Sequence, residues 1–222
     1  DLPWVVHATH LGHELHQDGT MDLDGKMKRA SFIENSTEIR EMFAFAHPSQ
    51  VLSAVQTYAG HFYGSMLWDL FGDVAGQVYR SWNTCVKLSW FLPRSSHNYF
   101  VDGLAGSLPS VKKKILSQYV NFFQNLSSSV SREVRIMSRV FSQDIQSVTG
   151  RNLANINNLF NLDPRTDPAA AFKTKMIGYV TPEVDAWRLP LLRKLLDQRR
   201  DFHSCEEDTT TIDDLIESLC SS

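Results

Sequence analysis

Four histidines near the start of the chain recur at every third position: His7, His10, His13 and His16. Imidazole nitrogens are common zinc ligands, and three or four of them would complete a site. A helix would rotate this series around its axis, and a strand would place successive members on alternating faces. Because only a folded turn would bring the rings together, a metal site is the weaker interpretation of this segment.

Basic side chains gather in the middle of the chain, where they could bind phosphates. Residues 80–151 hold ten Lys or Arg against three Asp or Glu, a balance of +7, although the whole chain carries −3. The clusters that stand out are Lys112, Lys113 and Lys114, and then Arg132, Arg135 and Arg139 at the i, i+3, i+7 spacing of one helical stripe. This local excess indicates a surface for a polyanion, and a solubilising face is the alternative.

Five aromatic residues are candidates for stacking on bases: Tyr63, Trp68, Trp82, Trp90 and Tyr99. Trp82 and Trp90 keep the helical register of the valines around them, so we expect both in the core. Tyr99 follows Arg94 and His97 in a predicted loop. That loop therefore offers an exposed aromatic ring beside two nitrogen donors.

Helices must position most of these residues, because apolar side chains recur at helical spacing along most of the chain. The helices that this periodicity predicts cover residues 48–71, 74–90, 111–126, 130–145 and 153–160, and a last one starting at Thr181-Pro182. Pro190 should kink that last helix or delay its start. The N-terminus differs, since Trp4-Val5-Val6 and residues 10–15 are short, apolar and interrupted by Gly12. They predict a β-hairpin, with helix resuming near Lys26, and the fold class is therefore mainly α.

The composition is that of a soluble globular protein, with 42% hydrophobic and 21% charged residues. No stretch reaches the roughly 18–20 uncharged apolar residues of a membrane span, so we expect no membrane partner. Cys85, Cys205 and Cys220 are too widely spaced for a disulfide framework or a zinc pattern. This predicts an intracellular, reducing location, in the nucleus or the cytoplasm. Asp1 in place of Met leads us to expect a piece of a longer protein.

Three strings follow one another in a distinctive order: THLGH at 9–13, FYGSMLWDL at 62–70, and SWN at 81–83 with KLSWFLPRSSH at 87–97. This order resembles the segment immediately after the catalytic palm of non-LTR (LINE-type) retrotransposon reverse transcriptases. In that family a YLGH-type turn forms the primer grip, and a thumb follows with a YGS-LW helix, a Trp, an LP pair and a Thr/Ser-His step. The resemblance covers residues 4–100 and extends more loosely to about residue 200.

The resemblance implies a role for the residues around the glycine turn. His10, Leu11, Gly12 and His13 would form the primer grip, which holds the primer's 3′ end against the active site; ordinary packing is the alternative. A glycine there lets backbone approach a sugar–phosphate chain closely. The implied partners are an RNA template, a DNA primer, and the palm and fingers domains of the parent polymerase. The nucleic-acid contacts expected beyond the turn are Arg94, His97, Lys112, Lys113, Lys114, Arg132, Arg135 and Arg139.

The same resemblance divides the chain into five parts. Residues 1–25 would end the palm as a primer-grip-like hairpin, and 26–94 would form a helical thumb-like domain. Residues 95–163 would be a basic helical region, 164–202 a loop and a helix, and 203–222 an acidic tail with a short helix. RNA-containing duplexes are gripped by shape across a shallow minor groove, which suits such a helical body.

The residues of polymerase catalysis are missing. The family uses two magnesium ions held by aspartates, some of them in an aromatic-x-Asp-Asp turn. The one Asp-Asp pair here, Asp213-Asp214, follows Thr211-Ile212 and has the pattern of a solvated helix flank. We therefore expect no catalytic residue, no cofactor and no small-molecule substrate in this chain, and we assign the magnesium to the absent palm. The alternative function is a non-catalytic helical protein–protein interaction module that docks through its aromatic faces and its acidic tail.

Overall fold

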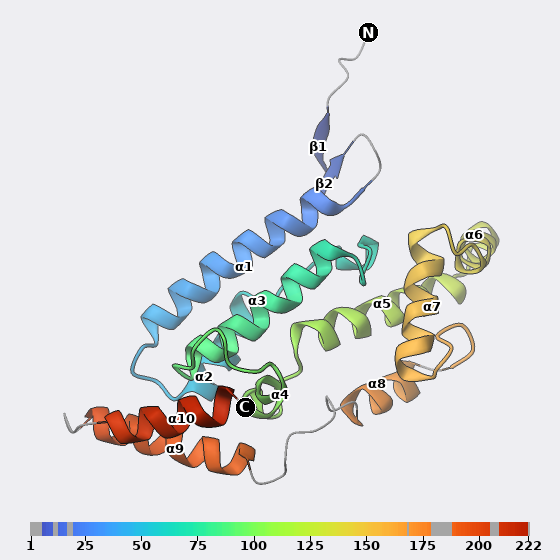
Figure 1. The fold of residues 1–222 in the computed structure, drawn as a ribbon. Coiled ribbons are helices and arrows are strands. Elements are labelled where there is room, and N and C mark those ends of the chain that lie inside the picture. The colour runs from blue at the N-terminus through green and yellow to red at the C-terminus, as the bar shows by residue number, and fades with distance from the viewer. Residues whose placement is uncertain are drawn as a thin grey trace. The chain divides into compact units, whose positions relative to one another are not determined.

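The computed structural model describes residues 6–10, 13–16, 20–167, 169–178, 188–204 and 209–221. Helices dominate, and a two-stranded antiparallel hairpin lies near the N-terminus (Figure 1). The predicted mainly α fold with an N-terminal β-hairpin is thus confirmed. The elements are β1 (His7–His10), β2 (His13–His16), α1 (Asp22–Met42), α2 (Pro48–Tyr58), η1 (Ser65–Leu67), α3 (Asp73–Ser89), α4 (Tyr99–Ala105), α5 (Val111–Ser127), α6 (Arg132–Gln143), α7 (Val148–Phe160), α8 (Ala169–Gly178), α9 (Arg188–Ser204) and α10 (Thr210–Ser221).

The chain folds into two compact units, each assembled from three separate segments. Unit 1 takes the described residues of Asp1–Glu34, Gly60–Ser81 and Val111–Tyr179. Unit 2 takes those of Asn35–Ala59, Trp82–Ser110 and Val180–Ser222. Helices α1 and α3 each begin in unit 1 and end in unit 2. The five-part division drawn from the sequence stays a prediction.

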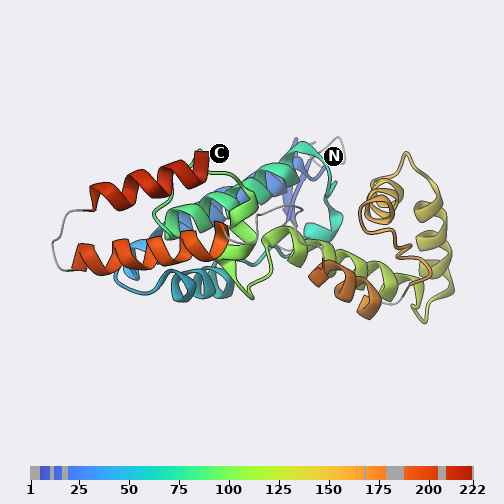
Figure 2. The same ribbon diagram turned by 60° about the horizontal axis from the view of Figure 1, so that its bottom comes forward.

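Unit 1 is built around α5. Helices α6 and α8 pack on α5, and α7 bridges these two, an arrangement that both views show (Figures 1 and 2). The buried face of α5 includes Ile115, Tyr119 and Phe123. Phe160 of α7 meets Phe172 of α8 edge to face, with ring centroids 5.1 Å apart. Edge-to-face aromatic pairs of this kind add to the stability given by apolar burial.

In unit 2, α4 packs on both α2 and α9, and α10 packs on α9. Trp82 and Trp90 are buried here, as their register predicts. The Trp90 indole N–H donates to the carbonyl of Leu104, 3.2 Å away, at the end of α4. Helix α2 starts with a capping box. The His47 side chain accepts a hydrogen bond from the backbone of the first turn, and the Gln50 side-chain oxygen accepts one from the backbone N–H of His47.

The helix expected over residues 48–71 is shorter than its apolar periodicity suggests. It ends at Tyr58, and a single 3₁₀ turn follows at Ser65–Leu67. A continuous helix through residue 64 is excluded, because the φ of Gly64, +84°, lies in the left-handed region. The glycine therefore turns the chain where Phe62 and Met66 would otherwise continue the helical stripe.

The starts of α1 and α9 can also be compared with the sequence-based expectation. Helix α1 begins at Asp22 rather than near Lys26. Helix α9 begins at Arg188, with Pro190 in its first turn, where proline is tolerated. The expected start at Thr181 lies outside the described residues. Within them, none of the helices combines the length and apolar composition that crossing a membrane requires.

Candidate nucleic-acid interface

The hairpin that carries the predicted primer grip is antiparallel. Its register pairs His7 with His16, Thr9 with Glu14, and His10 with His13. Leu11 and Gly12, between the strands, lie outside the described residues, and so does the side chain of His10. Among the residues that are described, no three His, Cys, Asp or Glu side chains are placed to hold a metal ion.

His13 joins the hairpin to the loop before η1. Its ring stacks on Tyr63, with centroids 5.1 Å apart and planes 27° from parallel. The neighbouring Gly64 leaves room for this ring, because a Cβ built at position 64 would overlap the imidazole. Two of the strings singled out in the sequence, THLGH and FYGSMLWDL, therefore meet at this point.

A buried carboxylate, that of Asp24, bonds to both of the segments that meet at His13 and Tyr63. Asp24, in the first turn of α1, is 1% exposed. It accepts the indole N–H of Trp68 at 2.8 Å and the backbone N–H of Glu14 at 3.3 Å. The Nδ1 atom of His13 lies 3.5 Å from its Oδ1, close enough for an ion pair but without hydrogen-bond geometry. An acidic side chain also suits the first turn of a helix, where the dipole is positive.

Asn152 of α7 extends this network into the helical body of unit 1. Its amide is fully buried, accepts from the backbone N–H of Leu70 at 3.0 Å, and donates to the carbonyl of Trp68 at 2.9 Å. The Tyr79 hydroxyl donates to the carbonyl of Leu70 at 2.9 Å. The irregular segment after η1 therefore has its backbone groups satisfied by side chains. No motif in the sequence marks Asn152, and a buried asparagine far from its partners gives no local signal.

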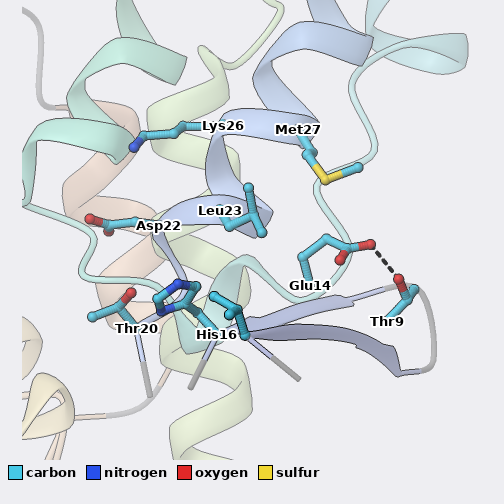
Figure 3. A pocket seen from close by; sticks show the side chains of 9 residues that line it. Thr9, Glu14, His16, Thr20, Asp22, Leu23, Lys26 and Met27 are labelled. Atoms are coloured by element: carbon cyan, nitrogen blue, oxygen red, sulfur yellow. Dashed lines mark hydrogen bonds between the residues drawn. The ribbon is translucent and has the colours of Figure 1, made fainter. Parts of the chain in front are cut away.

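A cavity of about 630 Å³ opens between the hairpin and the start of α1 (Figure 3). Side chains from both elements line it, and the Thr9 hydroxyl donates to the Glu14 carboxylate at 2.6 Å. Figure 3 labels eight of the lining residues: Thr9, Glu14, His16, Thr20, Asp22, Leu23, Lys26 and Met27. This mixture of carboxylates, hydroxyls and one ammonium group suits hydrogen bonding to sugar hydroxyls rather than to a run of phosphates.

The three lysines at the start of α5 are partly engaged in the fold. The Lys114 ammonium donates to the carbonyl of Gly60 at 2.8 Å, and its burial lowers the pKa of this side chain. The Lys112 ammonium lies over the Tyr79 ring, 5.9 Å from its centroid. All three side chains, Lys113 included, are half-buried. This lysine cluster therefore supports the fold as well as offering positive charge.

The arginines of α6 lie beyond the other end of α5. Helix α5 has 17 residues, about 25 Å at the helical rise, so the lysine and arginine clusters do not form one patch. Arg135 donates to the carbonyls of Ser129 and Val130, at 2.6 and 2.9 Å, and secures the α5–α6 turn. The side chains of Arg132 and Arg139 are exposed, and their guanidinium groups form no hydrogen bond or ion pair with the described residues. Of the six basic side chains, these two are the most available for phosphates.

Arg94 and His97 belong to unit 2, in the loop after α3, and both are exposed. The buried Lys87 ammonium donates to the carbonyls of Arg94 and Ser96, which holds this loop in place. The side chain of Tyr99, the aromatic residue expected to be exposed there, lies outside the described residues.

Helix α6 presents its apolar face outward, although the apolar stripe of a helix usually packs on a core. The exposed side chains on it and beside it are Val130, Ile136, Met137, Val140, Phe141 and Ile145, each at least 45% exposed. The helix packs instead through Ser138 and Ser142, which are buried and donate to the carbonyls of Arg135 and Arg139. Small side chains with internally satisfied hydroxyls permit such close packing, which leaves the apolar stripe uncovered.

Comparisons with known proteins identify no relative from which a function could be transferred: no family model, no curated protein and no solved structure matches the chain.

Proposed function

We propose that this chain holds the RNA template–DNA primer duplex for an RNA-directed DNA polymerase of the non-LTR retrotransposon kind. The observation that carries the proposal is the contact of His13 with Tyr63 and Gly64. It joins the primer-grip-like string to the thumb-like string, which are about fifty residues apart in the sequence. A part that grips a duplex needs such a rigid connection between the strand turn and the helical body.

The mechanism would be positional. The hairpin would lie against the 3′ end of the primer, and the hydroxyl and carboxylate groups beside it would bond to the sugars. Arg132 and Arg139 would neutralise phosphates farther along the duplex. The magnesium ions and the aspartates that extend the primer would belong to the palm of the parent polymerase.

Charge reversal at Arg132 and Arg139 tests the proposal directly. The variant Arg132→Glu/Arg139→Glu should bind an RNA–DNA hybrid at least about tenfold more weakly at 50 mM salt, because two phosphate contacts are lost. The slope of log K against log salt should fall by about 2. Both side chains are exposed and without partners among the described residues, so the fold should not change. Fluorescence anisotropy with a labelled hybrid of about 20 base pairs, at 50 and 200 mM salt, measures both quantities.

Lys173, an exposed base on α8, supplies the matched control. The variant Lys173→Glu should keep nearly the full affinity for the hybrid. Lys173→Glu changes the net charge half as much as the double variant does, so a loss in log affinity half as large would mean that only net charge matters, and α6 would then have no specific role. If the unaltered chain shows no salt-sensitive binding of the hybrid, the proposed function is wrong.

The exposed apolar stripe of α6 favours a second candidate function, a helical protein–protein interaction module. Isolated apolar side chains on a surface are ordinary, but six on one short segment are typical of an interaction site. Since Arg132 and Arg139 flank the stripe, its partner would be an amphipathic helix with acidic flanks. The hybrid titration separates the two candidates, because this module requires no affinity for nucleic acid.

A further inference from the structure

Tyr63 exposes an aromatic ring that the proposed contacts to the duplex do not use. Its side chain is 67% exposed, although the residues on both sides of it, Phe62 and Gly64, are buried. One face of the ring stacks on His13, with centroids 5.1 Å apart. Because the ring keeps this exposure with one face covered, its other face is open to solvent.

The backbone that carries Tyr63 is fixed by its neighbours in the sequence. Phe62 is 2% exposed, and its ring packs against Phe32 of α1 and against Trp68, with centroids 5.6 and 6.2 Å away. On the other side, Gly64 turns the chain with a φ in the left-handed region. Core packing therefore determines where the exposed ring lies.

The His13 ring beneath Tyr63 is also held in place. The His13 side chain is 12% exposed, and its Nδ1 atom lies 3.5 Å from the buried carboxylate of Asp24. A tyrosine side chain has only two rotatable bonds, so such a ring offers a large contact area at a low cost in conformational entropy. A ligand that stacks on Tyr63 would therefore meet a ring that is already ordered.

Ammonium groups lie next to the loop that carries Tyr63. The Lys114 ammonium donates to the carbonyl of Gly60, three residues before Tyr63. Helix α5, whose first turn carries Lys112, Lys113 and Lys114, packs against η1, which begins two residues after Tyr63. All of these groups belong to unit 1. An open aromatic face beside positive charge is the combination that single-stranded nucleic acids require, because the ring takes a base and the charge attracts the phosphates.

We propose that Tyr63 is a stacking platform for an unpaired nucleobase of a single-stranded RNA or DNA segment. The base would lie on the open face of the ring, on the side away from His13, and phosphates of the same strand would lie near the lysines of α5. Since every base has a π face, the site should accept all four bases. The inference goes beyond the proposed function, because bases inside a duplex are covered on both faces and cannot use this ring.

Two single strands of equal charge test the inference on the full chain. One is a labelled strand of about eight thymidines, and the other has abasic sites in place of the bases. In fluorescence anisotropy at low salt the thymidine strand should bind about tenfold more tightly, which is the usual effect of stacking one base. Added salt should weaken both strands equally, because their phosphates are the same. Equal affinities of the two strands would overturn the proposal.

The variant Tyr63→Ala identifies the ring that takes the base. It should remove the preference for the thymidine strand and leave the affinity for the abasic strand unchanged, whereas Tyr63→Phe, which keeps a ring, should retain the preference. The matched control is Tyr58→Ala, which removes a tyrosine of similar exposure, 71%, from α2 in unit 2 and should change neither affinity. A preference that persists in Tyr63→Ala, or an equal loss of affinity for both strands, would refute the assignment.

Discussion

Replacing Asp24 with alanine is expected to lower the free energy of unfolding by about 3 kcal/mol. The substitution leaves the buried indole N–H of Trp68 and the backbone N–H of Glu14 without their acceptor. Each unsatisfied buried donor costs roughly 1–3 kcal/mol, and some of this is recovered where water reaches Glu14. Urea denaturation measures the loss, and hydrogen exchange at the Glu14 amide shows whether the hairpin has separated from α1.

Two further variants show that the effect comes from this carboxylate. Asp24→Asn keeps one acceptor oxygen for the indole and should lose about 1 kcal/mol. Asp22→Ala removes an exposed carboxylate from the same turn of α1 and should change stability by no more than about 0.5 kcal/mol. A small loss in Asp24→Ala, comparable with that of Asp22→Ala, would show that the buried bonds do not anchor the hairpin.

Gly64→Ala should destabilise unit 1 by about 2 kcal/mol or more. An alanine at the φ of +84° is strained, and its methyl group would overlap the His13 ring. The imidazole would have to turn away, and the stacking on Tyr63 would be lost. Thermal denaturation gives the loss in stability, and the ring protons of Tyr63 report on the stacking by NMR.

A double-mutant cycle separates the backbone strain from the clash. The three atoms nearest to a Cβ at position 64 all belong to the His13 ring, so in a His13→Ala background this clash is removed and the strain of about 1 kcal/mol should remain. If Gly64→Ala costs the same in both backgrounds, the glycine serves only the turn, and the contact between the two strings does not depend on it.

Periodicity predicted the parts of the fold that local pattern determines. The helical register placed Trp82 and Trp90 in the core, and the glycine-interrupted apolar run at the N-terminus indicated a hairpin. The same method extended α2 too far, because the stripe through Tyr58 and Phe62 continues across Gly64. An apolar stripe shows which side of a segment is apolar. It does not show that the segment is one continuous helix, because a glycine in the left-handed region interrupts the helix.

The candidate site was predictable in its segments but not in its contacts. The strings around His13 and Tyr63 stood out, yet Asp24 and Asn152, which fix them, carry no local signal. The outward apolar face of α6 was also beyond sequence reasoning, since amphipathicity shows where a helix can pack and not whether a partner covers it. The lysine and arginine clusters lie near one another in the sequence, but one full helix separates them.

The interleaving of the two units constrains how the polypeptide reaches its native state. Three segments in each unit mean that the chain passes from one unit to the other five times. On the ribosome, unit 1 stays incomplete until residues near Tyr179 emerge, by which time most of unit 2 has also been synthesised. The N-terminal segments of unit 1 therefore cannot fold as a complete unit while they emerge. A truncation anywhere between residues 35 and 179 leaves both units incomplete. Limited proteolysis should therefore release no stable fragment that corresponds to a single unit.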